Sequence, residues 1–346
     1  MKRPTIIDIA REVGVSKAAV SYALNGRGGV SARTRQRILE VAAEMGWRAS
    51  SAARALSSDR AASVGIVLAR SPEVLHTEPF FMQMVAGLER TLSEHGVSLQ
   101  LALATDTATE LATYQHWWAE RRVDGVVVTD LRVSDPRPRL LRELGTPTVY
   151  FGIAHPMPGS SVLRGNEHDV ARTALAHLAQ LGHRRIGHVQ GPRDLQHTVR
   201  REEALREAAE EFDGVVLSQA SGGYTEEGGV RATRQLLAAR DRPTAIVYDN
   251  DVMAVAAVAS ADDLGVRVPA DLSVVAWDDS MLCRVVRPAV TAFAHGVAQD
   301  AATAALMLLE LVETGAVEDR ELSPRRLVSR ASTAAPGSQQ NDNGEN

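Results

Sequence analysis

Apolar positions in the first 46 residues recur at helical spacing in three short segments. Thr5 with Asp8 three residues later predicts a capping box on the first helix, Gly14 suits a left-handed residue that ends it, and Ser16 can cap the second helix. A third helix is predicted over 31–46. The apolar positions are Ile9, Ala10, Val13, Ala19, Val20, Ala23 and Leu24, then Ile38, Val41, Ala42 and Met45. Three helices that share one small core predict a helix-turn-helix unit.

From Ser63 onward the pattern changes to continuous apolar runs that alternate with amphipathic helices. The runs are 64–68, 99–103, 125–128, 148–151, 185–189, 215–217, 245–248 and 272–277, and the helices are 80–95, 109–121, 169–181, 198–212, 225–240 and 252–264. Valine- and isoleucine-rich runs between helices imply parallel sheets covered on both faces. We therefore expect an α/β fold of two doubly wound lobes, with a ligand cleft at the carboxyl ends of the strands.

The domain limits follow from these changes of pattern. The headpiece spans 1–48, and a hinge helix or linker spans 49–60, where the alanine-rich stretch 48–58 is helical in composition but only about two turns long. The two-lobed core spans 61–333, with an N-lobe of about 61–160 and 293–322 and a C-lobe of about 161–292 and 323–333. The polar segment 334–346 is expected to be a disordered tail.

Charge is distributed unevenly along the chain. Through Arg60 there are 11 lysines and arginines against 5 acidic residues, whereas the remainder has 27 against 38. The overall net charge of −5 hides this contrast. A small basic unit ahead of an acidic body is expected where only the small unit meets phosphate. A merely solvated basic face would give the same charges, so charge alone leaves both interpretations open.

The cysteine content and the amino terminus indicate the compartment. Cys283 is the single cysteine, which excludes an internal disulfide and a multi-cysteine metal site and agrees with a reducing environment. We interpret it as a small apolar side chain in the core. No run of eighteen apolar residues occurs, and residues 1–5 lack the apolar stretch of a secretory signal. We therefore expect a cytoplasmic protein.

Five segments carry a family resemblance. TIIDIAREVGVSKAAVSYALN (5–25) and VSARTR (30–35) closely resemble the headpiece of the lactose-repressor/galactose-repressor (LacI/GalR) family of transcriptional regulators. LGHRRI (181–186), YDNDVM (248–253) and SVVAWDD (273–279) resemble the core of the same family, and the resemblance runs in order from about residue 5 to about residue 332. It implies a repressor with a periplasmic-binding-protein-like core, whose operator affinity is set by a small-molecule effector.

The second helix of a helix-turn-helix enters the major groove with its amino-terminal residues toward the bases. We expect Lys17, Ala18 and Tyr22 to read the operator, because lysine can donate to guanine, alanine can contact a thymine methyl, and tyrosine can donate or accept. The family often carries arginine where this chain has Tyr22, so a different preferred operator is expected. The phosphate contacts expected are Thr5, Ser16, Ser21, Asn25, Ser31 and Thr34, with Arg33, Arg35 and Arg37 adding salt-sensitive affinity.

The predicted hinge helix carries an apolar residue without an obvious core. The resemblance gives Leu56 the role of a wedge that paired hinge helices insert into the minor groove, with Ala53 one turn earlier approaching the same groove. Packing of Leu56 against the core is the alternative. Thr5, Ser16 and Ser31 likewise have a second role as helix caps, which can coexist with phosphate contact.

The resemblance also carries a set of effector-binding positions onto the core. They are Phe80, Phe81, Asp169, Arg201, Tyr224, Asn250, Asp278 and His295. Together they offer hydrogen-bond donors, acceptors and flat rings, the mixture that a polyol requires. Leu195 and His197 stand where purine-responsive relatives keep polar groups, so we expect a sugar or sugar derivative rather than a nucleobase.

Several of these assignments have alternatives. Arg200 and Asp279 are rivals of the neighbouring Arg201 and Asp278, Phe80 and Phe81 can be core residues, and His295 can simply pack or be solvated. We interpret His183 and His188 as structural.

Pseudo-palindromic double-stranded operator DNA implies a homodimer, with 80–95 and 296–312 as candidate interface helices unless they pack only within their own domain. Ligand would then close the lobes and change the spacing of the hinge helices, as inducer or as corepressor.

Two other protein classes were considered. A sugar-transport protein would share the two-lobed core but would need a secretory signal and no headpiece. An enzyme would leave the basic headpiece unexplained, and the sequence has neither a Gly-x-Ser-x-Gly elbow nor a Gly-x-x-x-x-Gly-Lys-Ser/Thr loop. We therefore expect no catalytic residue, no metal ligand and no cofactor.

Overall fold

The computed structural model describes residues 4–24, 26, 28–47, 60–70, 74, 78–153, 157 and 159–337. Of the predicted hinge segment 49–60, all but Arg60 lies outside the described residues, as do the predicted DNA contacts Asn25, Ala53 and Leu56. The chain divides into two compact units. One is the headpiece unit, which runs to Ser63 and includes Arg121–Asp124, and the other is the core.

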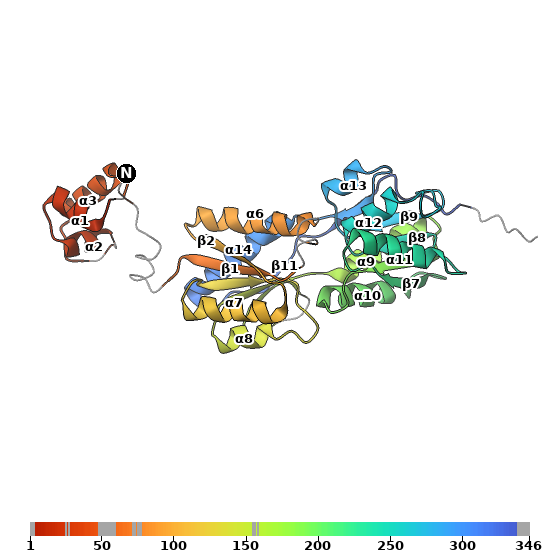
Figure 1. The fold of residues 1–346 in the computed structure, drawn as a ribbon, viewed down its shortest axis with the longest axis horizontal. Helices are drawn as coiled ribbons and strands as arrows, with labels where there is room; N and C mark the ends of the chain where they lie inside the picture. Colours follow the sequence, from red (N-terminus) through yellow and green to blue (C-terminus); the bar gives the residue numbers. More distant parts are fainter. Residues whose placement is uncertain are drawn as a thin grey trace, which may run out of the picture. The chain divides into compact units, whose positions relative to one another are not determined.

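The headpiece contains the three predicted helices, labelled in Figure 1. They are α1 (Ile6–Val13), α2 (Lys17–Leu24) and α3 (Ala32–Glu44). Each contributes to one small buried cluster, made of Ile9, Ala10, Val20, Ala23, Ile38, Val41 and Ala42. The helical spacing of apolar residues therefore predicted both the helices and the core that they share.

Local capping explains where the helices begin and end. The Thr5 backbone N–H donates to Asp8 Oδ2 at 2.8 Å, and the Asp8 N–H donates to Thr5 Oγ1, which confirms the capping box. Gly14 ends α1 in the left-handed conformation, with φ of 75°. Ser16 Oγ accepts from the N–H of Ala19 at 3.1 Å. The tight turn between α1 and α2 is thus fixed by residues 14–16.

The N-lobe of the core is built on a six-stranded sheet. Its order is β11 (Arg320–Glu321), β5 (Ser161–Arg164), β4 (Thr148–Ile153), β3 (Gly125–Val128), β1 (Ser63–Leu68) and β2 (Ser98–Leu103). The helices are α6 (Pro79–Glu94), α7 (Thr107–Ala119), α8 (Arg137–Glu143) and α14 (Val297–Thr314). In Figure 1, α6 lies on one side of the sheet and α7 and α8 lie on the other. The sheet is therefore covered on both faces, as predicted.

The C-lobe has a second six-stranded sheet. Its order is β12 (Arg326–Val328), β10 (Thr291–Ala294), β9 (Ser273–Ala276), β8 (Ala245–Tyr248), β6 (Arg185–Gln190) and β7 (Val216–Ser221), flanked by α9 (Glu167–Gln180), α10 (Gln196–Ala209), α11 (Glu226–Leu237), α12 (Asp251–Ala259) and α13 (Met281–Val285). Ile246 and Tyr248 pack with α11 and α12, whereas Ala245 and Val247 pack with α9 and α10. Alternate residues of a strand face opposite sides of the sheet, and helices cover both sides. Every position of β8 is therefore buried.

The chain crosses between the lobes after β5, after β10 and after β11. The predicted lobe limits were wrong by a few residues, because β5 (residues 161–164) belongs to the N-lobe sheet and β10 ends only at Ala294 in the C-lobe sheet. The strands β5, β10, β11 and β12 were not predicted. β11 and β12 have three residues or fewer, β5 has only two apolar residues, and β10 consists of threonine, phenylalanine and two alanines, so none forms a valine- or isoleucine-rich run.

The carboxyl-terminal segment packs against the C-lobe before the described residues end. Ala334 accepts a hydrogen bond from His183 Nε2 at 2.8 Å, and its N–H donates to Ser273 Oγ at 3.1 Å. The prediction of a disordered tail from residue 334 was therefore wrong for residues 334–337, and residues 338–346 lie outside the described part. Two polar anchors, His183 in the turn before β6 and Ser273 at the start of β9, hold the segment in place.

Candidate functional site

A cavity lies between the two lobes of the core. Residues of both lobes line it, with charged and aromatic side chains among them, as is common for ligand sites. Its polar side chains follow strands directly: Arg70 follows β1, Asp130 follows β3, Asp249 follows β8, Asp278 follows β9, and His295 follows β10. Since the carboxyl ends of parallel strands meet at one edge of a sheet, residues far apart in sequence converge here.

The structure brings together seven of the eight predicted effector-binding residues. Those that line the cavity are Phe80, Phe81, Arg201, Tyr224, Asn250, Asp278 and His295. Arg200 also lines the cavity, whereas Asp279 does not and instead pairs with Arg330 at 2.7 Å. The geometry therefore favours Asp278 over its neighbour and leaves both arginines at the site.

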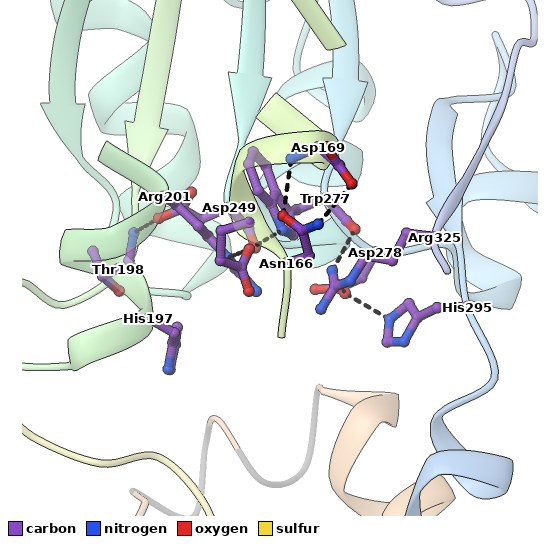
Figure 2. A network of polar contacts seen from close by, with 12 residues as sticks. Asn166, Asp169, His197, Thr198, Arg201, Asp249, Trp277, Asp278, His295 and Arg325 are labelled. Carbon is purple, nitrogen blue, oxygen red and sulfur yellow. Dashed lines mark hydrogen bonds and ion pairs between the residues drawn. The ribbon is translucent and has the colours of Figure 1, made fainter. Parts of the chain in front are cut away.

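Asp169 is the exception, and its placement corrects the prediction. It is exposed on α9 and does not line the cavity, and its carboxylate accepts a hydrogen bond from Asn166 Nδ2 at 2.6 Å (Figure 2). Glu167, two residues earlier, lines the cavity instead. A shift of two residues turns a side chain to another face of a helix, which alignment by sequence motif does not resolve.

Arg201 is held rigidly at the C-lobe wall of the cavity. Its side chain is buried, one guanidinium N–H donates to the backbone oxygen of Asp249 at 2.6 Å, and another donates to Glu167 Oε2 at 3.3 Å. The guanidinium carbon lies 5.0 Å from the centre of the Trp277 ring, and the Trp277 indole N–H donates to the same Glu167 oxygen. The arginine is thus pre-organised for a ligand by its partners rather than by the ligand itself.

Asp249, which holds Arg201, is itself anchored by a residue of β6 and by the residue that follows β6. Its Oδ1 lies 2.7 Å from His188 Nε2, and its Oδ2 accepts from the N–H of Gly191 at 2.8 Å. Both His188 and Asp249 are fully buried. His188 therefore has a structural role, as predicted, since it fixes the carboxylate whose own backbone oxygen holds Arg201.

Asp278 forms a second fixed cluster with His295 and Arg325. Its Oδ1 lies 2.9 Å from His295 Nε2 and accepts from Arg325 at 3.2 Å (Figure 2). Burial acts to raise the pKa of Asp278, but the hydrogen bond with His295 and the charge of Arg325 outweigh it and hold the pKa well below the usual range. Asp278 is therefore an ionised acceptor at neutral pH, and His295 is one of its partners rather than a solvated side chain.

Tyr224 supplies an aromatic wall. Its backbone is in the left-handed region, with φ of 66°, which is rare for a residue with a side chain and clusters at functional sites. A Cβ on Gly191 would overlap the Tyr224 ring, so the close approach requires glycine there. The His197 ring stacks on the tyrosine with a centroid separation of 5.9 Å and an angle of 19°.

His197 is neutral at physiological pH. Burial lowers its pKa to about 4, with a further lowering from the charge of Arg201. Its Nε2 lies 2.9 Å from the Tyr224 hydroxyl, and its Nδ1 lies 3.8 Å from Asp130. A neutral imidazole can both donate and accept, so it adds a versatile hydrogen-bonding group to this wall.

The N-lobe contributes an ion pair and an apolar surface. Arg70 donates to Asp130 Oδ2 at 2.8 Å, and its guanidinium carbon lies 5.9 Å from the centre of the Phe81 ring. Phe80 packs edge-on against both Phe81 and Phe151, at 5.4 and 6.3 Å between centroids. The cavity therefore combines a charged rim with an aromatic cluster, as ligand sites commonly do.

Glu78 and Asn250 link the two lobes directly. Asn250 Nδ2 donates to Glu78 Oε1 at 2.9 Å, while Asn250 Oδ1 caps α12 by accepting from the N–H of Met253. Burial raises the pKa of Glu78 to about 7, although the hydrogen bond from Asn250 and the charge of Arg70 act to lower it. The side-chain oxygen of Asn250 therefore caps a helix, and its side-chain nitrogen contacts the opposite lobe.

Sequence reasoning missed part of the cavity lining. Among the missed polar residues are six charged ones, Arg70, Glu78, Asp130, Glu167, Asp249 and Arg325. Five of them follow a strand or begin a helix within a few residues, so polar residues just beyond a predicted strand end were the available signal. Arg325 follows the short strand β11, which the apolar pattern did not reveal, and therefore gave no such signal.

The headpiece presents a separate polar surface on α2. Lys17 and Ala18 are exposed, and Tyr22 is 42% exposed although its ring is largely apolar. Val20 and Ala23 on the same helix are buried. Ser31 Oγ accepts from the N–H of Thr34 at 3.2 Å, so Ser31 caps α3 as expected. The three residues predicted to read bases are therefore free of the headpiece core.

Two protein families match separate parts of the chain, one in the headpiece and one in the core. Residues 5–50 match "Bacterial regulatory proteins, lacI family", and residues 175–333 match "Periplasmic binding protein-like domain". The HTH-type transcriptional regulator CelR of Thermobifida fusca is 34% identical over 297 residues, which cover 84% of this chain and 86% of CelR. The chain belongs to the lacI family of bacterial regulatory proteins. It is therefore a regulator of transcription.

Solved structures of the lacI family agree with the observed fold. A CelR–cellobiose complex is 29% identical, has a TM-score of 0.72, and is matched over 95% of this chain and 100% of that chain. A lac repressor dimer bound to operator and the anti-inducer ONPF is 24% identical, with a TM-score of 0.82 over 96% of this chain and 100% of that one. The second likeness shows that the fold is shared.

Among the helices of the described residues, none is both long and apolar enough to cross a membrane. No group of three or more histidine, cysteine, aspartate or glutamate side chains in the described part of the chain is arranged to hold a metal ion.

Proposed function

We propose that this lacI-family regulator is a homodimeric repressor of the bacterial cytoplasm, where operator DNA is found. It binds a pseudo-palindromic operator and senses a sugar or sugar derivative in the cavity between its lobes. The role requires binding alone, so we propose no catalytic activity. The convergence on one cavity of seven residues that the family resemblance named is the observation that carries the ligand-sensing part.

Base reading is assigned to α2. Lys17, Ala18 and Tyr22 are exposed on one helix whose other residues hold the headpiece core, so they can reach base edges without any change in packing. The phosphate contacts proposed are Thr5, Ser16, Ser21, Asn25, Ser31 and Thr34, supported by Arg33, Arg35 and Arg37. Ala53 and Leu56 are proposed for the minor groove on the strength of the family resemblance.

A sugar fits the chemistry of the cavity. Arg201 donates, Asp278 accepts, and neutral His197 can do both, while the ring of Tyr224 offers a flat apolar face. Sugar hydroxyls need alternating donors and acceptors, and the C–H face of a sugar ring stacks on aromatic rings. The CelR relative was solved with cellobiose, so gluco-configured disaccharides are the first candidates.

Dimerisation is assigned to the outer faces of α6 and α14. The two helices pack against each other within the N-lobe through a shared buried cluster, so intradomain packing accounts for their inner faces. Their outer faces expose Met82, which is 63% exposed, and Leu306, which is 41% exposed. Apolar residues of this size on paired helices suit a two-fold interface.

Operator binding can be tested without knowing the effector. Selection of bound fragments from random DNA by the full chain should yield a pseudo-palindrome. Tyr22→Ala should weaken binding to that sequence by about 30-fold or more and relax the preference at one base pair of each half-site, because a good base contact is worth about 1–3 kcal/mol and the dimer loses one in each half-site.

Glu12→Gln, on an exposed position of α1, is the matched control and should leave the preferred sequence unchanged. Recovery of unrelated fragments by the wild-type chain would refute operator recognition.

A further inference from the structure

A smaller pocket adjoins the cavity beside the beginnings of α12 and α13. It measures about 360 Å³ when counted out to its opening, and four of the residues that line it also line the main cavity: Glu78, Phe80, Asp278 and His295. Four of its lining residues are carboxylates: Glu78, Asp251, Asp278 and Asp279. We refer to it below as the acidic pocket; these four residues form a wall that it shares with the main cavity.

Asp251 leaves a hydrogen-bond acceptor unused in the acidic pocket. The residue is 3% exposed, its Oδ1 accepts from the N–H of Val252 at 3.0 Å, and its Oδ2 has no hydrogen-bond partner. Burial raises the pKa of Asp251 to about 6, helped by the nearby charge of Asp278. A buried carboxylate oxygen without a donor is costly, so this oxygen is poised for one.

Asp279 adds a second unused acceptor. Its Oδ2 accepts from Arg330 at 2.7 Å, but its Oδ1 is buried without a partner. Glu78, on the opposite lobe, has the amide of Asn250 as its hydrogen-bond donor. Two buried carboxylate oxygens of the acidic pocket, Asp251 Oδ2 and Asp279 Oδ1, therefore have no donor in hydrogen-bonding geometry, although the nearby Ser280 hydroxyl acts to lower the pKa of Asp251.

The arginines of the main cavity are already committed to carboxylates. The pairs are Arg70 with Asp130 at 2.8 Å, Arg201 with Glu167 at 3.3 Å, and Arg325 with Asp278 at 3.2 Å. Arg200, the remaining arginine in the lining, lies 3.9 Å from Glu203. If an anionic group drew Arg70, Arg201 or Arg325 from its partner, it would leave a partly buried carboxylate unpaired, which is strongly unfavourable. Only Arg200, whose partner Glu203 is exposed, is exempt from this cost among the lining arginines.

We propose that the acidic pocket is a subsite for a hydrogen-bond donor of the effector, and that it makes the regulator selective for sugars without phosphate or carboxylate groups. The donor is a hydroxyl or an ammonium group, since both satisfy carboxylate oxygens. This inference rests on the proposed function and narrows its ligand class from sugars in general to neutral and amino sugars.

A donor on an organic ligand suits the pocket better than a metal ion. Across the residues that the structure places, no carboxylate cluster has the arrangement of a metal site. The shared lining also makes the pocket an extension of the place where the sugar is proposed to lie.

Matched pairs of sugars test the inference by calorimetric titration of the full-length protein. The pairs are glucose with glucose 6-phosphate, galactose with galacturonate, and cellobiose with its 6′-phosphate, and glucosamine is the amino arm. We expect the uncharged member of any pair that binds to be at least tenfold tighter than the anionic member. Tighter binding of glucosamine than of glucose would identify ammonium as the donor, and the reverse would identify hydroxyl.

A variant connects the selectivity to the acidic pocket. Asp251→Asn removes the carboxylate without changing its size, and it should reduce the ratio between the two members of a pair at least threefold. Asp263→Asn, at an exposed position outside both cavities, is the control and should leave the ratio unchanged. The ratio is a within-protein comparison, so a general loss of stability would not move it.

The outcomes separate this inference from the proposed function. If the phosphorylated or carboxylated member binds as tightly as its neutral counterpart or more tightly, the inference is wrong while sugar sensing stands. An unchanged ratio in Asp251→Asn would also overturn the role of the acidic pocket. If no sugar of the panel binds, the proposed sugar effector fails, and the inference fails with it.

Discussion

The charged residues of the cavity are arranged as pairs that hold one another in place. Arg201 is fixed by Glu167 and by the backbone of Asp249, and Asp278 is fixed by His295 and Arg325. Such pairs cost desolvation free energy, but they keep the polar groups in one geometry before a ligand arrives. A ligand therefore meets a prepared site and loses little free energy in ordering it.

Asp278 offers a direct test of ligand binding at this scale. Asp278→Asn keeps the size of the side chain but removes the charge that strengthens its hydrogen bonds. We expect the affinity for cellobiose, or for whichever sugar the panel identifies, to fall at least tenfold, because hydrogen bonds to charged groups contribute about 1.5–3 kcal/mol.

The same calorimetric titration on Asp169→Asn provides the comparison. Asp169 lies outside the cavity, so its affinity should stay within twofold of the wild type. Equal losses in both variants would mean that the cavity geometry does not identify the ligand contacts.

Glu78 predicts a dependence of folding stability on pH. Its pKa is raised from 4.5 to about 7 in the folded protein, so the folded state binds this proton more tightly than the unfolded state. Its contribution to stability is therefore fully present below about pH 4.5 and is lost as the pH rises through about 7.

Chemical denaturation of wild type and Glu78→Gln at pH 5 and pH 8 measures the effect. From pH 5 to pH 8 the wild type should lose about 1–3 kcal/mol of unfolding free energy relative to the variant, which has no proton to release. A difference between the two proteins that does not change with pH would contradict the raised pKa.

At the scale of elements, the headpiece depends on local signals that the sequence displays. Thr5 with Asp8 and Ser16 with Ala19 satisfy amide groups that the ends of short helices leave open, and Gly14 supplies the left-handed residue between them. Helices of eight residues are marginal by themselves, so these caps and the shared apolar cluster together stabilise them.

Removal of one cap should loosen the first helix. Thr5→Ala should destabilise α1 by about 1 kcal/mol, which corresponds to roughly fivefold faster amide hydrogen exchange in that helix without DNA. Thr225→Ala is the matched variant, because Thr225 caps α11 in the core by accepting from the N–H of Gly228 at 3.1 Å. It should speed exchange in α11 and leave α1 unchanged, and the absence of any change in α1 for Thr5→Ala would argue against the cap.

Prediction from sequence succeeded where apolar residues fill most of an element and failed where polar residues interrupt it. Strands such as β1 and β8 are largely apolar runs, and the headpiece helices follow apolar periodicity. The strand β5 escaped because only Val162 and Leu163 of its four residues are apolar, and this moved the predicted lobe limit by one strand.

Prediction of the candidate site also succeeded for some residues and failed for others. Motif resemblance identified Arg201, Tyr224 and Asp278, but it placed Asp169 at the cavity instead of Glu167. Which face of α9 a carboxylate occupies depends on how the helix packs against the sheet, and one sequence does not contain that information. The ion pair of Arg70 with Asp130 joins residues 60 positions apart, so it too required the fold.

At the scale of the whole molecule, the function requires the cavity and the headpiece to be coupled. The two lobes touch across the cavity through Glu78 with Asn250 and through backbone hydrogen bonds of 131–133 with 194–196. A ligand that changes how the lobes meet can alter how two N-lobes pair, and hence how two headpieces are spaced. By linkage, operator and sugar must then change each other's affinity by the same factor.

Titration of a fluorescent operator with the full-length protein, with and without saturating sugar, tests this coupling most directly. The account predicts that sugar changes operator affinity at least fivefold, that Asp278→Asn reduces the change at a fixed sugar concentration, and that a scrambled duplex binds weakly throughout. Equal, weak affinity for operator and scrambled duplex, unaltered by a sugar that calorimetry shows to be bound, would contradict it.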